Sequence, residues 1–182
     1  MAYINLNNEA PGIRSLVLYR PDTGKYLYDL VAVLLRGKSE LSAAERELIA
    51  AYISKLNNCT FCTKSHAAAA QCLYGEQVNL VDDVLHNPKQ SAISEKMKTL
   101  LSIAQKVQVN GKTVSENDVD KAKKAGATDS QIHDTVLIAA TFSMFNRYVD
   151  GLGTITPIND EAYKIMGEIM VTNNYSFPKT TY

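Results

Sequence analysis

The residues most able to do chemistry in this sequence are two cysteines and a histidine at helical spacing. Cys59 and Cys62 are three positions apart, and His66 follows Cys62 by four. Residues three or four apart share one face of a helix, so Cys62 and His66 would be stacked, with Cys59 one turn earlier. At a helix start the free backbone N–H groups and the dipole can lower a thiol pKa from about 8.5 to between roughly 3.5 and 7.5. Because the thiolate is the nucleophile, this pattern predicts a reactive pair that can also close a disulfide.

Glu47 is the carboxylate that can support this group, and it comes from the preceding helix. Asn57–Asn58 breaks that helix, and Glu47 lies ten residues before Asn57, or about 15 Å back along the axis. His66 lies eight residues after Asn58, or about 12 Å along the next helix. If the two helices fold back on the break and their phases agree, Glu47 would orient His66, which would take a proton from Cys62.

The elements that must position these residues are helices separated by short breaks. Ser42 and Glu45 form a capping box, in which each side chain satisfies a backbone donor of the other. The hydrophobic periodicity and the caps predict an all-α fold with no βαβ alternation. The expected helices are Tyr26–Leu35, Ser42–Leu56, Cys59–Leu73, Val78–Leu85, Ser94–Val107, Glu116–Lys124, Ser130–Val149 and Asp160–Val171.

The length of 182 residues predicts one domain, 1–182, with a redox core at about 41–73. The polar tail 172–182, which contains Pro178, is expected to be an extended arm. Hydrophobic residues make up 46% of the chain and charged residues 21%, as in ordinary globular proteins. Lys plus Arg and Asp plus Glu are 19 each, so the chain lacks the basic balance of a general nucleic-acid binder. The zero net charge also permits self-association.

The first twelve residues lack the basic start and apolar run of a secretory signal. The most apolar long stretch, Ile132–Phe145, is too short and too polar to span a bilayer. We therefore expect a cytoplasmic protein whose thiols are kept reduced. Three cysteines in such a protein indicate a reactive or metal-binding pair rather than a disulfide scaffold.

The main structural alternative for Cys59, Cys62 and His66 is a zinc site. Zinc modules usually add a second close cysteine pair, which this sequence does not contain. The fourth ligand would have to be a single further side chain, His86, His133 or Glu47.

Other polar positions have plainer interpretations. Cys72 is turned about 80° from Cys62 on a helical wheel and is expected in the core. His86 precedes an Asn–Pro loop signal and is expected to be exposed. Ser143, Asn146 and Asp150 form a polar stripe that could bond neighbouring helix ends, line a substrate pocket or meet another subunit.

With Glu47, Cys59, Cys62 and His66 in register, the sequence resembles the alkylhydroperoxidase D (AhpD) branch of the carboxymuconolactone decarboxylase-like family. The flanking segments Leu41–Ile49 and Phe145–Gly153 also resemble the peroxidase-related members of that family. The resemblance implies an all-α helical bundle centred on the CxxC hairpin, assembled as homo-oligomers of three or six subunits.

The resemblance also implies roles for the four residues. Cys62 would be the peroxidatic thiol that becomes a sulfenic acid, and Cys59 would resolve it to a disulfide. Glu47 and His66 would form a proton relay. An external dithiol or thiol protein would restore the reduced form, and the substrate would be hydrogen peroxide or an organic hydroperoxide. No flavin, haem or nucleotide motif is present, so we expect no bound cofactor.

One departure concerns Phe61, which stands where the best-known members carry a second histidine before the second cysteine. One relay group is therefore missing, which leaves open a non-peroxidatic disulfide oxidoreductase. A redox-sensing or zinc-binding interaction module without turnover is the alternative from another class. Decarboxylation is less expected, because the decarboxylating members generally lack the CxxC pair.

Overall fold

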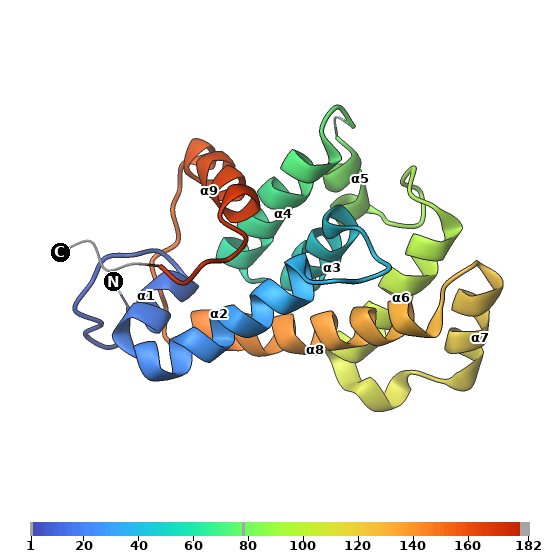
Figure 1. Ribbon diagram of the computed structural model, residues 1–182, viewed down its shortest axis with the longest axis horizontal. Helices are drawn as coiled ribbons and strands as arrows, with labels where there is room; N and C mark the ends of the chain where they lie inside the picture. Colours follow the sequence, from blue (N-terminus) through green and yellow to red (C-terminus); the bar gives the residue numbers. More distant parts are fainter. Residues whose placement is uncertain (1, 78, 179–182) are drawn as a thin grey trace.

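The computed structural model describes residues 2–77 and 79–178. Within these residues it contains helices and no strand, which confirms the all-α prediction (Figure 1). The elements are α1 Ile13–Tyr19, α2 Pro21–Arg36, α3 Ala43–Leu56, α4 Thr60–Tyr74, α5 Leu80–His86, α6 Glu95–Asn110, the 3-10 turn η1 Gly111–Thr113, α7 Glu116–Lys124, α8 Asp129–Gly151 and α9 Asp160–Thr172.

The expected helix starts are confirmed where side-chain caps mark them. Ser42 Oγ accepts a hydrogen bond from the backbone N–H of Glu45 at 3.2 Å, and the Glu45 carboxylate accepts from the Ser42 N–H at 2.8 Å. Thr128 and Gln131 form the same box at the start of α8, whereas at α6 the Ser94 hydroxyl accepts from the Met97 N–H without a return bond. The helix expected at Val78–Leu85 is present as α5, although Val78 itself lies outside the described residues.

Helix α1 was not expected, and α2 begins five residues before the predicted start. The start of α1 carries no side-chain cap, and its N-cap residue Gly12 has φ +54°. A Cβ at Gly12 would lie 2.0 Å from the ring of Phe61, so only glycine fits there. Pro21 opens α2 at the first helical position, which its fixed φ and missing N–H suit.

Helix α3 lies at the centre of the molecule and packs against α2, α4, α5, α6 and α8. Its residues Leu48, Ile49 and Ile53 are fully buried in the main core. Helix α9 lies beside α4 (Figure 1). A Cβ on Gly167 would come within 2.7 Å of the Ala68 backbone, so this glycine permits the close approach of α9 to α4. Helix α4 is therefore enclosed between α3 and α9.

The turn that joins α3 to α4 is held by side chains from two other helices. Asn57 Nδ2 donates to Asn146 Oδ1 at 2.8 Å, and Gln108 Nε2 donates to Asn57 Oδ1 at 2.8 Å. Asn146 Nδ2 in turn donates to the buried Ser54 hydroxyl at 3.0 Å. Because these amides and the hydroxyl satisfy one another, the break between the helices is fixed in one geometry.

The polar stripe on α8 therefore serves mainly to bond a helix end, the first of the three roles considered for it. Ser143 and Asn146 face the α3–α4 turn and are buried, whereas Asp150 is exposed.

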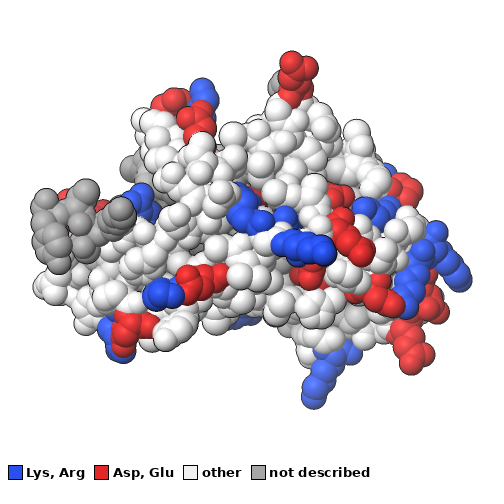
Figure 2. Space-filling view, viewed as in Figure 1, with Lys and Arg blue, Asp and Glu red and all other residues white. Residues whose placement is uncertain are grey.

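Charged side chains gather on the visible face at the end of the molecule formed by α6 and α7, at the right of the view (Figure 2). Over α2 and α8 the same face is largely uncharged, apart from a few neighbouring pairs of opposite charge (Figure 2). Among the described helices, none combines the length and the apolar composition needed to cross a membrane.

Candidate active site

The α3–α4 hairpin places Glu47 directly against His66. Glu47 Oε2 and His66 Nδ1 are 2.7 Å apart, and both side chains are buried. The two helices therefore meet in the phase that the sequence argument required but could not establish. The close contact also selects a tautomer, because a carboxylate oxygen accepts a hydrogen bond and so favours the proton on Nδ1. His66 Nε2 is then free to accept a proton.

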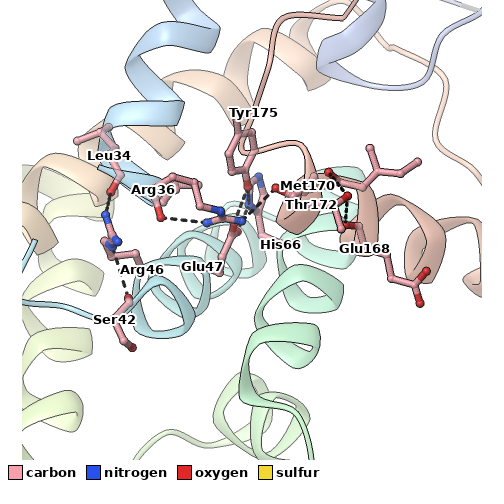
Figure 3. Close-up of polar contacts among 12 residues, drawn as sticks. Leu34, Arg36, Ser42, Arg46, Glu47, His66, Glu168, Met170, Thr172 and Tyr175 are labelled. Atoms are coloured by element: carbon pink, nitrogen blue, oxygen red, sulfur yellow. Dashed lines mark hydrogen bonds and ion pairs between the residues drawn. The ribbon is translucent and has the colours of Figure 1, made fainter. Parts of the chain in front are cut away.

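Two further side chains bind the other oxygen of Glu47 (Figure 3). The Arg36 guanidinium, in the last turn of α2, donates to Oε1 at 2.6 Å. The hydroxyl of Tyr175, in the segment after α9, donates to the same atom at 2.6 Å. Burial alone would raise the pKa of Glu47, but His66, Arg36 and Tyr175 together hold it below its ordinary value of 4.5. Glu47 is therefore a carboxylate at neutral pH although it is fully buried.

Arg36 also donates to the backbone carbonyl of Leu35, in the last turn of α2, at 2.9 Å. The neighbouring Arg46 is buried and donates to the backbone carbonyls of Leu34 and Gly37, at 3.0 and 2.9 Å. These bonds satisfy carbonyls that a helix end leaves without intrahelical partners. Arg36 also donates to the Met170 carbonyl at 3.3 Å, which ties α2 to α9 (Figure 3).

The two cysteines differ in their surroundings. Cys59 is the N-cap residue of α4 and is fully buried, whereas Cys62, in the first turn of α4, is 3% exposed and faces a cavity. Both are free thiols. A hydrogen bond with Cys62, burial and the charge of Cys62 raise the pKa of Cys59. For Cys59 the expected lowering at a helix start is therefore wrong, because these effects outweigh the helix dipole.

The cavity beside Cys62 has a volume of about 160 Å³. Cys62 and His66 both lie on its wall, whereas Cys59 and Glu47 lie behind that wall and do not line it. Most of the lining is apolar, and the principal apolar residues are Ile13, Val31, Phe61, Phe142, Phe145, Met166, Ile169 and Met170. A molecule in this cavity would therefore meet the Cys62 thiol and the His66 imidazole but not Cys59 or Glu47.

Phe61 provides part of this apolar wall. Its ring is 3% exposed and lies 6.3 Å from the ring of Tyr163, centroid to centroid. At the position where the best-known relatives carry a histidine, this chain has a buried phenylalanine ring, which offers no proton to the cavity.

Three other titratable residues considered from the sequence are not brought to the site. His86 and His133 are exposed. Across residues 2–77 and 79–178, no group of three or more His, Cys, Asp or Glu side chains is arranged to hold a metal ion. Cys72 is exposed, so its predicted place in the core is wrong. It lies in the last turn of α4, where no residue is fully buried.

Arg36 and Tyr175 are the site residues that the sequence argument missed. Arg36 directly follows the expected helix Tyr26–Leu35 and ends α2 in the structure, a position at which a basic residue has an ordinary reason to occur. Tyr175 lies in the tail that was expected to be an extended arm. The described part of that tail turns at 173–175 and returns to the site, and residues 179–182 lie outside the described residues.

We predict that alkylation will distinguish the three thiols of the reduced protein. Cys72 should react first because it is exposed, and Cys62 next because it faces the cavity. Cys59 should react at least roughly ten-fold more slowly than Cys62, because it is buried and protonated. Initial rates of iodoacetamide labelling, followed at each cysteine by peptide mass spectrometry, give this order. In denaturant the three rates should become similar, and a Cys59 that reacts before Cys62 in the folded protein would contradict the assignment.

The fold and site define a class of protein: an all-helical chain in which a CxxC pair opens one helix and a glutamate–histidine pair joins that helix to the one before it. The model of the carboxymuconolactone decarboxylase family matches residues 21–73. This match spans α2, α3 and most of α4, and so includes all four residues of the motif. A search of curated proteins found no match.

Similar solved structures include an AhpD-core, uncharacterized peroxidase-related protein from Ralstonia eutropha JMP134. It is 27% identical with a TM-score of 0.77, over 87% of this chain and 81% of that one. An uncharacterized peroxidase-related protein from Silicibacter sp. TM1040 is 23% identical with a TM-score of 0.76, over 85% and 78%. A protein of unknown function from Agrobacterium tumefaciens, for which an AhpD antioxidant-defence role has been suggested, is 16% identical with a TM-score of 0.68, over 79% and 97%. The family match over residues 21–73 and these solved structures support the resemblance of this chain to the carboxymuconolactone decarboxylase-like family and its AhpD-like branch.

Proposed function

We propose that this protein is a thiol peroxidase that reduces hydrogen peroxide or organic hydroperoxides through a Cys59–Cys62 dithiol/disulfide cycle. The observation that carries the proposal is the 2.7 Å contact between Glu47 and His66, with His66 and Cys62 on the wall of one cavity. A nucleophile, a base and a group that orients the base are the parts that an activated thiol needs.

In the proposed reaction, His66 Nε2 takes the proton of Cys62. The thiolate then attacks one peroxide oxygen, so that an S–O bond forms and the O–O bond breaks. His66 returns the proton to the departing oxygen, which leaves as an alcohol or as water. Cys62 is now a sulfenic acid, and the Cys59 sulfur displaces its oxygen as water with formation of the disulfide.

The apolar lining of the cavity favours organic hydroperoxides over hydrogen peroxide. Aliphatic and aromatic side chains form most of the wall, so an alkyl or aryl group would leave water on binding. A cavity of about 160 Å³ suits a compact group of this kind.

An external dithiol or thiol protein is the proposed electron donor. Its thiolate would attack the Cys59–Cys62 disulfide to form a mixed disulfide. A second thiol of the donor would then release the protein with both cysteines reduced and the donor oxidised to a disulfide.

We also propose a homo-oligomer of three or six subunits. It is supported by the exposed side chains of Tyr26, Leu30 and Val33, which lie four and three residues apart on one face of α2. A cytoplasmic location, where the dithiol would be kept reduced, is proposed on the same footing.

A disulfide oxidoreductase is the second candidate, favoured by the apolar Phe61 in place of a proton donor. Steady-state assays with dithiothreitol as donor separate the candidates, with tert-butyl hydroperoxide or a model disulfide as the oxidant and Cys62→Ser as the control. The proposal predicts peroxide consumption that depends on Cys62. Disulfide reduction without peroxide consumption would select the second candidate, and no turnover of either substrate would favour a sensing or binding module.

A further inference from the structure

We propose that Tyr175 is a positioning residue of the thiol site, whose hydroxyl fixes Glu47 and thereby the orientation of His66. This inference rests on the proposed function for its place in a peroxide reaction. It concerns a residue outside the CxxC motif, outside its helical hairpin, and outside the matched family segment 21–73.

Tyr175 contacts all three of the other site residues Glu47, His66 and Arg36. Its hydroxyl donates to Glu47 Oε1 at 2.6 Å. The same hydroxyl lies 3.4 Å from His66 Nδ1, the nitrogen that contacts Glu47 Oε2. Its ring is nearly parallel to the imidazole, at 16° with centroids 6.4 Å apart. The Arg36 guanidinium carbon lies 4.9 Å from the centre of the same ring. In Figure 3 the side chain reaches the Glu47–His66 pair from the side opposite to α3.

The backbone adopts an uncommon conformation to make these contacts. Asn174 and Tyr175 have φ values of +47° and +58°. Asparagine tolerates this left-handed region, but an aromatic residue occurs there infrequently and at some cost in free energy. The segment is anchored two residues later, where the Phe177 ring packs edge-on against Tyr28 at 5.5 Å. Such a conformation persists only where the surrounding contacts enforce it.

The chemical effect follows from how the two oxygens of Glu47 are used. Oε1 accepts from Arg36 and Tyr175, which leaves Oε2 for His66 Nδ1. With both oxygens engaged, the carboxylate cannot rotate without breaking a charge-assisted hydrogen bond. The Nδ1–H tautomer is thereby maintained, and Nε2 stays available as the base that serves Cys62. Without the hydroxyl, Glu47 Oε1 would lose one of its two hydrogen bonds and the carboxylate could rotate more easily. His66 would then spend less time in the orientation that presents Nε2 to Cys62.

The test is the pH dependence of Cys62 alkylation in a Cys72→Ser background, with Tyr175→Phe as the variant. Phenylalanine keeps the ring contacts with His66 and Arg36 and removes only the hydroxyl. We expect alkylation at neutral pH to slow about ten-fold, less than the full contribution of a general base, and the rise of the rate to move to higher pH. Tyr74→Phe is the matched control, because Tyr74 is a partly buried tyrosine in α4 that does not line the cavity. It should reproduce the wild-type profile, and melting curves would establish that each variant is folded at the assay temperature.

A double-mutant cycle tests whether Tyr175 acts through Glu47. In a Glu47→Gln background, Tyr175→Phe should have little further effect on the rate, because the two residues act on the same step. A Tyr175→Phe profile that superimposes on the wild type, or an equal loss in both backgrounds, would overturn the proposal. Both readouts use an alkylating agent and no peroxide. If the alkylation results hold while wild-type protein does not react with a hydroperoxide, the proposed function fails and the role of Tyr175 stands.

Discussion

Replacing Cys59 with serine is expected to stop the thiol cycle at a sulfenic acid on Cys62, and replacing Cys62 is expected to abolish peroxide-driven oxidation of the pair. The rate of oxidation by an organic hydroperoxide should fall at least about 100-fold in Cys62→Ser, since no other thiol reaches the cavity beside a base. In Cys59→Ser the first step should proceed near the wild-type rate.

This asymmetry has a physical basis in the burial of the two sulfurs. Cys62 lies on the cavity wall with His66, whereas Cys59 is fully buried behind it. The pKa of Cys59 is raised by its hydrogen bond with Cys62 and by burial, so Cys59 is held as a thiol. Serine also suits the N-cap position that Cys59 occupies, so the start of α4 should survive the change.

The two variants should be compared in a Cys72→Ser background, because the exposed Cys72 could otherwise be oxidised or form intermolecular disulfides. A sulfenic-acid reagent such as dimedone, with intact-protein mass spectrometry, measures the trapped species. A dimedone adduct in Cys62→Ser but not in Cys59→Ser would reverse the assignment of the two roles.

Replacing Glu47 with glutamine should slow the reaction of Cys62 by about 10²- to 10⁴-fold, the range for loss of a general base. Glutamine has nearly the same shape, but its Nε2H₂ group donates where the carboxylate accepted. If this amide group faces His66, Nδ1 becomes the acceptor and the ring proton moves to Nε2, the wrong position for a base that serves Cys62. The single-turnover rate with tert-butyl hydroperoxide, followed by loss of free thiols, measures the effect.

The same substitution should change how stability depends on pH. The pKa of Glu47 in the folded protein lies below its unfolded value of 4.5, because His66, Arg36 and Tyr175 outweigh the effect of burial. Its stabilising contribution is therefore fully present above about pH 4.5 and is lost as the pH falls through the folded pKa. Glu47→Gln should remove this part of the acid sensitivity. At neutral pH it should also destabilise the protein by about 3–5 kcal/mol, because Arg36 is left buried without its counter-charge.

Glu168→Gln is the matched control for both measurements. Glu168 lies on α9 near the site, but its carboxylate is exposed and points away from Glu47 (Figure 3). It should leave the thiol reaction and the midpoint of unfolding nearly unchanged. If Glu47→Gln behaved like Glu168→Gln, Glu47 would have no part in activating Cys62.

Local signals predicted most of the fold because each of them has a local physical cause. Ser42 with Glu45 and Thr128 with Gln131 satisfy backbone donors within one turn, so the starts of α3 and α8 could be located from sequence. The short α1 has no such cap and was missed. Pro21 marks the start of α2, because proline suits the first turn of a helix, whereas the apolar periodicity begins only at Tyr26.

The site could be predicted only where its residues share one hairpin. Helical arithmetic placed Glu47 and His66 at similar heights, although the phase between the helices depends on the Asn57–Asn146 packing far along the chain. Arg36 and Tyr175 reach the same carboxylate from 11 residues before it and 128 residues after it. Neither belongs to a local pattern, because only the tertiary packing of α2 and of the segment after α9 brings them to Glu47.

The most direct test of the central claim is the mass and free-thiol count of the reduced Cys72→Ser protein, before and after one equivalent of an organic hydroperoxide. The account predicts the loss of two thiols and of two hydrogen atoms in mass, with one equivalent of alcohol formed. Unchanged thiols and mass, in protein shown to be reduced and metal-free, would contradict a peroxidatic dithiol at Cys59 and Cys62.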